Sequence, residues 1–363
     1  MAVPQQIPEG AIRFNTDSSK MELWIGDKWM IVSTSLPVGI STGHTYDNTH
    51  LVNSAGHGRG FLCGGYNAPA FRDQVDMITI PTQGNAVDFS EMTGGKYGAG
   101  TCSSSIRAVQ MGGYQTPNVN TNLIEFITFS TQAGGTNFGD LDVARRGTGA
   151  VSNETRGLAI AGTQHPASPN KQNTMEFVTI ATEGDAVDFG DTTEVGNNMG
   201  AAGSPTRGVI AANSGPGSPI AGVVTMQFVT ITTTGNAQDF GSLTQPLVET
   251  FGCSNATRAL FGGGVFPSPE AAVSRIEYCT IATTGGSVFF GDLTRTRQHS
   301  SACSSAVRGV WMGGVTHNVI DYVQIATLGD AVDFGDLALE DGEETKLLLT
   351  LMVGCKNRSF VLY

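Results

Sequence analysis

Apolar and polar residues alternate with a period of two along much of this chain. The clearest segment is Ile124-Glu125-Phe126-Ile127-Thr128-Phe129, and segments that begin at Met175 and Ile276 repeat its pattern. β-branched and aromatic residues dominate all three, as suits a half-buried strand. No segment sustains the period of about 3.6 residues that marks an amphipathic helix. We therefore expect strands and turns with almost no helix.

A second pattern is an arginine that follows a small polar cluster and precedes a short apolar strand. It occurs seven times, and successive arginines are 48 to 51 residues apart. These arginines are Arg59, Arg107, Arg156, Arg207, Arg258, Arg308 and Arg358. Such regular spacing indicates an internal repeat of about 50 residues.

A third pattern is a segment that ends in Asp-Phe-Gly-Asp or a variant of it. It occurs six times, with Phe89, Phe138, Phe189, Phe240, Phe290 and Phe334. From each phenylalanine to the next arginine the distance is 18 residues in five cases and 24 in the last. From each arginine to the following phenylalanine it ranges from 26 to 33. One half of the repeat is thus nearly fixed in length, and the other half carries the variation.

Each repeat can be divided into four short strands, and units of about 50 residues with four strands are typical of β-propeller blades. The apolar strand that ends in Gly-Gly, followed by an aromatic residue such as Tyr278 or Tyr322, resembles the kelch repeat. The chain differs from that family in having Phe where Trp is usual. It also has Ala161-Gly162 and Ala212-Asn213 in place of Gly-Gly. The resemblance implies an all-β, kelch-like propeller of seven blades over residues 50–363.

The two ends of the chain bear on how such a ring would close. The sequence ends at Tyr363, after the second strand of its seventh unit, so that unit lacks two outer strands. Residues 1–35 contain an alternating stretch at 11–16 and a Gly-Asp turn at 26–28, which together predict a hairpin. We expect these N-terminal strands to close blade seven, with residues 36–49 as a linker. The alternative is that residues 1–35 form a separate attachment hairpin.

Composition narrows the class of protein. The chain has 48 glycines and 14 prolines among 363 residues, while 40% of its residues are hydrophobic, which indicates a folded, turn-rich protein. Its net charge is −12 and it has no cluster of Lys and Arg, so we expect no nucleic-acid partner. No stretch approaches the about 20 apolar residues of a membrane span. The N-terminus lacks the features of a signal peptide, and we expect no membrane partner.

The cysteines follow the repeat. Cys102, Cys253, Cys303 and Cys355 occupy the same position of the innermost strand, where other repeats have Ser54, Val151 and Ala202. Interchange with small residues predicts small, buried side chains. The remaining two, Cys63 and Cys279, lie in other apolar strands, and no Cys-x-x-Cys or Cys/His spacing is present. We therefore predict free thiols and no metal site.

The repeated arginines could form a ring that binds anions. A group that recurs in every blade usually serves blade construction, however. We expect each arginine to pair with an acid of the Asp-Phe-Gly-Asp segment, such as Asp140, Asp188, Asp292 or Asp333. The chain has no nucleophile elbow, Walker loop or His-Glu-x-x-His motif. We predict no catalytic residue and no cofactor.

The length variation falls in the connections between the second and third strands. In an antiparallel blade these connections share a face with the links from each fourth strand to the next first strand. Loops of variable length on a rigid scaffold are the usual place for recognition, and aromatic residues in them supply contact area. The candidate binding residues on this face are Tyr66, Phe71, Tyr114, His165 and Phe266.

The N-terminal residues Gly10-Ala11-Ile12-Arg13-Phe14-Asn15-Thr16, followed by Glu22 to Trp29, resemble a segment common in bacteriophage tail-fibre and other virion proteins. The glycine-rich repeats are similar to kelch-like repeats in structural proteins of phages that infect marine cyanobacteria. These resemblances imply a non-enzymatic virion protein, assembled in the host cytoplasm and displayed on tail or capsid for host attachment.

Its implied partners are other virion proteins and a host surface glycan or receptor, and homo-oligomerisation stays open. Two other classes also remain open at this point. One is an intracellular kelch-type interaction adaptor, and the other is a propeller enzyme that acts on surface glycans.

Overall fold

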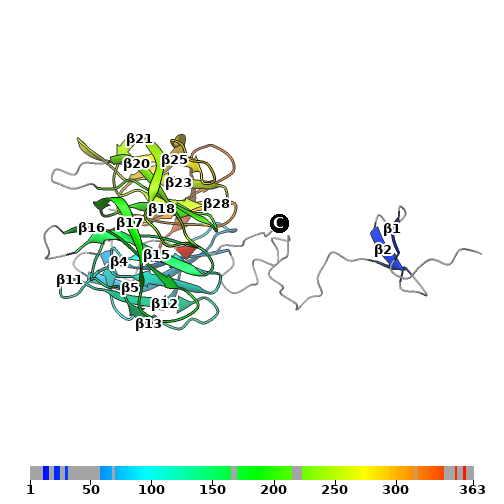
Figure 1. Ribbon diagram of the computed structural model, residues 1–363, viewed down its shortest axis with the longest axis horizontal. Coiled ribbons are helices and arrows are strands. Elements are labelled where there is room, and N and C mark those ends of the chain that lie inside the picture. Colours follow the sequence, from blue (N-terminus) through cyan, green and yellow to red (C-terminus); the bar gives the residue numbers. More distant parts are fainter. Residues whose placement is uncertain are drawn as a thin grey trace, which may run out of the picture. The chain divides into compact units, whose positions relative to one another are not determined.

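The computed structural model describes residues 11–15, 20–24, 29–31, 58–67, 70–164, 170–214, 223–314, 317–338, 348–349 and 355–356. The chain divides into two units, residues 1–51 and 52–363. Every regular element within the described ranges is a β-strand (Figure 1). The prediction of an all-β chain with almost no helix is therefore confirmed for these residues.

The first unit contains one antiparallel sheet of order β1-β2-β3. Its strands are β1 (Ile12–Asn15), β2 (Lys20–Trp24) and β3 (Trp29–Ile31). Ile12 lies opposite Leu23, and Trp24 lies opposite Trp29 across the predicted Gly-Asp turn. The N-terminal strands thus form as the alternation predicts, in a sheet of their own.

The described part of the second unit contains six sheets in which at least four strands follow one another antiparallel. We number them along the chain. The first has β4 (Arg59–Asn67), β5 (Ala70–Thr79) and β6 (Val87–Glu91), with β31 (Leu348–Leu349) and β32 (Cys355–Lys356) both paired to β4. The second has β8 (Gly100–Ser103), β9 (Arg107–Met111), β12 (Leu123–Thr128) and β13 (Thr136–Asp140).

The other four sheets repeat this plan. The third has β14 (Gly149–Ser152), β15 (Arg156–Thr163), β16 (Lys171–Thr179) and β17 (Val187–Gly196). The fourth has β18 (Gly200–Gly203), β19 (Arg207–Ala211), β20 (Val223–Thr230) and β21 (Gln238–Leu247). The fifth has β22 (Phe251–Ser254), β23 (Arg258–Gly262), β24 (Val265–Pro267), β25 (Glu270–Thr280) and β26 (Val288–Arg297). The sixth has β27 (Ser301–Ser304), β28 (Arg308–Met312), β29 (Val319–Gln324) and β30 (Val332–Asp336).

The first strands of the six sheets contact one another in a closed order. β8 contacts β14, and the series continues through β18, β22, β27 and β32 back to β8. Hydrophobic clusters fill the spaces between neighbouring sheets, since each cluster combines residues of adjacent sheets. The six sheets therefore surround a common axis, an arrangement compatible with a β-propeller.

Two short strands from the C-terminal part of the chain, β31 and β32, pair with β4. Cys355 of β32 lies opposite Phe61, in the same register in which Cys102 lies opposite Val109 in the second sheet. The expected closure of blade seven by N-terminal strands is not confirmed, because β1, β2 and β3 pair only with one another among the described strands. The expected count of seven is not confirmed either, because the chain's first and last repeats share one sheet and leave six.

The repeated aromatic residues form the centre of each sheet. In five sheets the phenylalanine of the fourth strand meets an aromatic ring of the third strand edge-on, with centroids 5.8–6.1 Å apart. The arginine of the second strand lies 4.2–4.9 Å from the centre of the same third-strand ring. The first sheet has Met77 at the third-strand position, and there Phe61 stacks on Phe129 of the second sheet instead, at 4.7 Å.

The same arginines join neighbouring sheets. Each donates a hydrogen bond to a backbone carbonyl just after the third strand of the next sheet. The pairs are Arg59–Phe129 (3.1 Å), Arg107–Ile180 (3.4 Å), Arg156–Ile231 (3.3 Å), Arg207–Ile281 (3.0 Å), Arg258–Ile325 (2.9 Å) and Arg308–Ile80 (2.8 Å). The last pair leads from the sixth sheet to the first and closes the series.

The structural role predicted for the arginines is therefore right, but the partner predicted for them is wrong. They bind carbonyl oxygens of the next sheet and aromatic rings of their own, whereas an acid of the Asp-Phe-Gly-Asp segment was expected. The one repeat arginine with an ion pair in the described residues is Arg107, which lies 3.7 Å from Glu183, an acid outside that segment.

Candidate functional site

The links and the variable connections meet on one face of the ring. β7 (Lys96–Tyr97) belongs to the link between the first and second sheets, and β10 (Tyr114–Gln115) belongs to the variable connection of the second sheet. The two pair in a small sheet completed by β11 (Val119–Asn120), with Tyr114 opposite Tyr97. Bridges between Arg146 and Thr163 and between Val248 and Val265 repeat this pairing in later sheets. We call this side of the ring the variable face.

Three of the predicted binding residues come together on the variable face. Tyr66 and Phe71 lie opposite each other on β4 and β5, with ring centroids 5.1 Å apart. Tyr97 lies 5.5 Å from both Tyr66 and Tyr114 and stacks on Phe71 at 5.8 Å. All four rings are half-buried. We call Tyr66, Phe71, Tyr97 and Tyr114 the aromatic cluster; Tyr97 was not predicted from the sequence.

A cation lies against this cluster. The guanidinium of Arg146 is 4.2 Å from the centre of the Tyr114 ring, and its Nη1 donates to the Tyr97 hydroxyl at 3.4 Å. Burial raises the pKa of Tyr97, although Arg146 lowers it, so the phenol stays neutral at physiological pH. No carboxylate of the described residues forms an ion pair with Arg146. Its charge is therefore available to a ligand.

Of the other two predicted binding residues, only Phe266 is described, and it does not join the cluster. Phe266 lies in β24 of the fifth sheet, where it is half-buried and packs against the core between the fourth and fifth sheets. His165 lies outside the described residues. Phe266 therefore serves the core of its own sheet as well as the variable face.

A pocket of about 230 Å³ opens beside Tyr97 and Arg146. Its lining comes from four links: those between the first and second, second and third, third and fourth, and fifth and sixth sheets. Each of these links leads into a first strand near the axis. The lining residues are Tyr97, Gly98, Arg146, Gly147, Asn197, Asn198 and His299. We call it the axial pocket; the sequence patterns did not predict it.

One position of every described link has a left-handed backbone. It lies two residues before the first strand and is occupied by Gly98, Gly147, Asn198, Glu249 and His299, with φ between 53° and 69°. Glycine adopts this conformation freely, whereas other residues do so at a cost of about 1–3 kcal/mol. Backbone strain of this kind is common at functional sites. Here it is found at three polar residues, Asn198, Glu249 and His299.

These three side chains are connected. Asn198 Nδ2 donates to Glu249 Oε1 at 3.0 Å, and His299 Nε2 lies 3.0 Å from Glu249 Oε2. The backbone continues the chain of contacts, because the Asn198 amide donates to the Gly147 carbonyl at 2.7 Å. Both carboxylate oxygens of Glu249 therefore have partners, and the three side chains hold one another in place.

The cysteines belong to the core and the axis. Cys63, Cys102, Cys253, Cys279 and Cys303 are buried, as predicted, while the side chain of Cys355 lies outside the described part. Cys102 fills the space above Gly157 of the next sheet, where a Cβ would lie 2.4 Å from its sulfur. Burial raises the pKa of the Cys279 thiol to about 12. Within the described ranges, no group of three or more His, Cys, Asp or Glu side chains could hold a metal ion.

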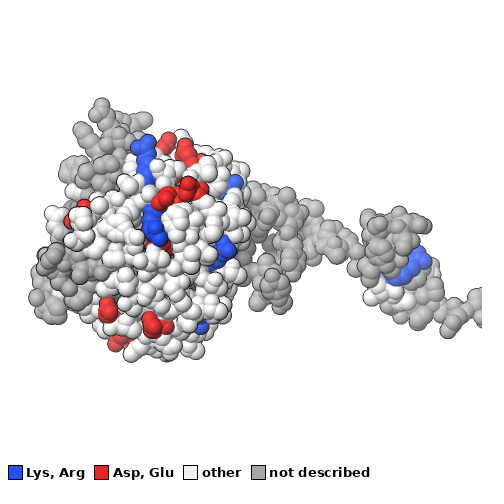
Figure 2. All heavy atoms as spheres, turned by 90° about the horizontal axis from the view of Figure 1, so that it is seen from above, with Lys and Arg blue, Asp and Glu red and all other residues white. Residues whose placement is uncertain are grey.

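Comparison with known proteins adds no identification. No protein-family model matches the chain, and no curated protein matches it significantly. None of its described residues form a helix long and apolar enough to cross a membrane. On the face that Figure 2 shows, the described Lys and Arg residues lie in small separate groups, interspersed with Asp and Glu.

Proposed function

We propose that this protein is a non-enzymatic structural component of a bacteriophage particle, folded as a six-bladed, kelch-like β-propeller that presents its variable face for recognition. One observation carries the proposal. The aromatic cluster, the unpaired charge of Arg146 and the axial pocket all lie on the same face of the ring. Contact area, a fixed cation and a recess are what a recognition surface needs.

The construction of the ring supports this use. The six repeat arginines that the structure describes contact a neighbouring sheet, and the repeat phenylalanines pack inside the sheets. Loops held by such a scaffold can change in length and residue type without disturbing the fold. Tyr66, Tyr114 and Arg146 of the variable face are among the residues that differ between repeats.

The N-terminal unit supports a place on the particle. β1, β2 and β3 form their own sheet and carry the segment that resembles phage tail-fibre proteins. We propose that residues 1–51 dock onto another virion protein, after assembly in the host cytoplasm. The ring then presents the variable face to a host surface glycan or receptor.

Mass spectrometry of purified particles tests this proposal. We expect the protein as a stoichiometric component, and particles made with a variant that lacks residues 1–51 should lose it. The lysate of the same cells serves as control, since the truncated protein should still be present there in soluble form. Particles that never contain the full-length protein would refute the virion role.

A further inference from the structure

We infer that the axial pocket binds an acidic saccharide, with Arg146 holding the anionic group and the links around the axis holding hydroxyl groups of the sugar ring. This inference rests on the proposed recognition function and assigns a ligand class to one part of the variable face. It is carried by the contacts that the lining residues already make, which leave a defined set of groups unoccupied.

The charge of the site comes from Arg146. Its guanidinium is oriented by the Tyr114 ring at 4.2 Å and by the Tyr97 hydroxyl at 3.4 Å. A planar guanidinium with several N–H donors suits a carboxylate or sulfate, which it can bind with two parallel hydrogen bonds. Glu249, the nearby acid, is not part of the pocket lining and is bound by Asn198 and His299.

The two asparagines present one donor and one acceptor. Asn197 Oδ1 accepts a hydrogen bond from the Ser214 hydroxyl, which leaves its Nδ2 to donate. Asn198 Nδ2 donates to Glu249, which leaves its Oδ1 to accept. A sugar hydroxyl is both donor and acceptor, so this pair matches a polyol better than it matches a simple anion.

Size and surroundings also favour a single sugar ring. Pockets for drug-sized ligands measure about 300–1,000 Å³, and this one measures about 230 Å³. It therefore takes one compact group and is too small for an extended peptide. The ring of Tyr97, which lines the pocket, offers an aromatic surface to the apolar face of a sugar.

The site is also organised before a ligand arrives. Asn198 and His299 keep left-handed backbones, with φ of 53° and 54°, and Glu249 joins their side chains. A lining that is already fixed loses little entropy on binding. This gives the strained backbone a role that the fold alone does not require, since Gly98 and Gly147 occupy the same position without strain.

Titration calorimetry of the full-length protein with sodium glucuronate, glucose and sodium acetate tests this inference. Glucuronate has both the ring and the charge, glucose has only the ring, and acetate has only the charge. We expect glucuronate to bind at least about tenfold more tightly than either of the others. Arg146→Gln should weaken glucuronate binding at least about tenfold, whereas Arg295→Gln, at an exposed arginine, should leave it unchanged.

Each other outcome overturns the inference. Equal binding of glucose would show that the charge is not recognised, and equal binding of acetate would show that the ring is not. Unchanged glucuronate binding in Arg146→Gln, or no binding of glucuronate by the wild-type protein, would exclude the axial pocket as an acidic-sugar site. If the protein is present in particles and Tyr66 and Tyr114 are needed for attachment, the proposed function survives such a failure.

Discussion

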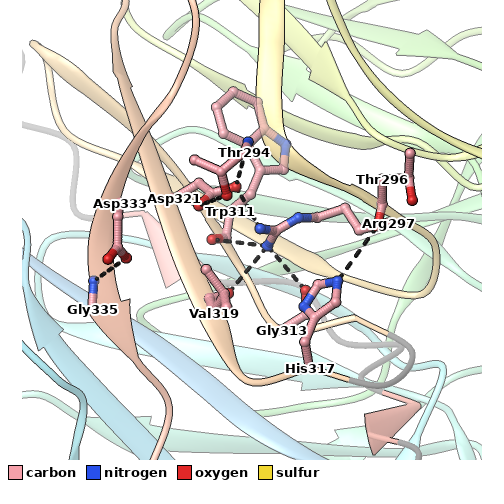
Figure 3. Close-up of polar contacts among 10 residues, drawn as sticks. All are labelled: Thr294, Thr296, Arg297, Trp311, Gly313, His317, Val319, Asp321, Asp333 and Gly335. Carbon is pink, nitrogen blue, oxygen red and sulfur yellow. Dashed lines mark hydrogen bonds and ion pairs between the residues drawn. The ribbon is translucent and has the colours of Figure 1, made fainter.

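Arg297 and Asp321 form an ion pair between the fifth and sixth sheets, and both side chains are fully buried (Figure 3). Nη1 of Arg297 also donates to the carbonyl oxygens of Gly313 and Val319 at 3.0 and 3.2 Å. Asp321 accepts hydrogen bonds from the amide and hydroxyl of Thr294 at 3.1 and 2.7 Å. Both Nη atoms of Arg297 and both carboxylate oxygens of Asp321 therefore have partners, which offsets most of the cost of burying the two charges.

The same positions carry matched residues at other contacts between sheets. Lys96 pairs with Glu125 between the first and second sheets, and Arg145 pairs with Glu176 between the second and third. Between the third and fourth sheets the equivalent residues are Gly196 and Gln227, which are both neutral. Between the fourth and fifth sheets the equivalent residues are Leu247 and Glu277, and there the cation comes from Arg275 on the same strand as Glu277. Each of the buried acids Glu125, Glu176, Glu277 and Asp321 thus has a basic partner, as the cost of an unpaired buried ion requires.

This pairing predicts the effect of removing one charge. Arg297→Met should lower the free energy of unfolding by about 3–5 kcal/mol, because it leaves Asp321 buried without its cation. The double variant Arg297→Met/Asp321→Asn should recover more than half of that loss, since it recreates a neutral contact. Urea unfolding measures the free energy of unfolding of the single and the double variant. Arg295→Met, at an exposed position on the same strand, is the control and should change stability by less than about 0.5 kcal/mol. A double variant no more stable than the single one would contradict this account.

Glu277 should make stability depend on pH in the acid range. Burial alone would raise its pKa, but hydrogen bonds from Ser287, Thr244 and Arg275 outweigh burial and lower it. A carboxyl whose pKa is lowered by folding stabilises the protein above its ordinary pKa of 4.5. This stabilisation decreases once the pH falls below 4.5, and it is lost when the pH has passed the lower pKa of Glu277 in the folded state. The difference in unfolding free energy between wild type and Glu277→Gln should therefore shrink with acidification between pH 6 and pH 3, and a constant difference would refute the assignment.

Gly241 is required where two sheets meet. Its φ is 143°, and a Cβ there would lie 2.3 Å from the carbonyl oxygen of Gly285 in the next sheet. Gly241→Ala should cost about 2–5 kcal/mol through backbone strain and overlap. Gly94→Ala is a matched control, because no atom lies within 4 Å of the Cβ that it adds. Thermal unfolding compares the two, and equal melting temperatures would show that the contact between sheets tolerates a side chain.

The buried thiols should be unreactive in the folded protein. Because burial raises the pKa of Cys279 to about 12, against an ordinary value of 9.0, almost no thiolate exists at neutral pH. Ellman's reagent should therefore leave Cys279 unmodified until denaturant is added, and then detect all six cysteines without prior reduction. Rapid labelling of Cys279 in the native protein, or a thiol count below six after denaturation, would contradict this.

Local patterns predicted the elements of the fold well. The alternation around Phe126 and the spacing of the arginines identified the strands, because successive side chains of a strand point to opposite faces of its sheet. The pairing of the chain's two ends could not be predicted in this way. Either terminus offered strands of suitable alternation, and which of them pairs with β4 is decided by a contact between residues far apart in the sequence. The partners of Arg258 and its equivalents were missed for a similar reason, since backbone carbonyls leave no mark in a sequence.

The candidate site was predicted in part. Tyr66, Phe71 and Tyr114 were found because they are aromatic residues in connections of variable length. Tyr97 and Arg146 were missed because they lie in the half of the repeat whose length is fixed. A usable signal was present there: the position two residues before each first strand changes from Gly98 to other residue types along the chain. Residue type varies in this half, although length does not.

Variants of the variable face need controls on the opposite face that leave the contacts between sheets intact. Asp185 and Asn236, in turns of the opposite face, accept hydrogen bonds from Asp140 and Asp191 of the preceding sheets at 3.0 Å. Replacing them would disturb the contacts between sheets. Ile106 and Val307 are better controls, because they lie in turns between first and second strands and are 52% and 50% exposed.

Binding to host cells by two double variants tests the central claim most directly. The account predicts that Tyr66→Ser/Tyr114→Ser lowers adsorption of the purified protein at least about tenfold, because the aromatic cluster provides the contact. Ile106→Ser/Val307→Ser should bind like the wild type, and melting curves of both variants establish that they fold. If the variable-face variant is folded and still binds fully, while the control variant does not bind, recognition belongs to the opposite face and the account is wrong.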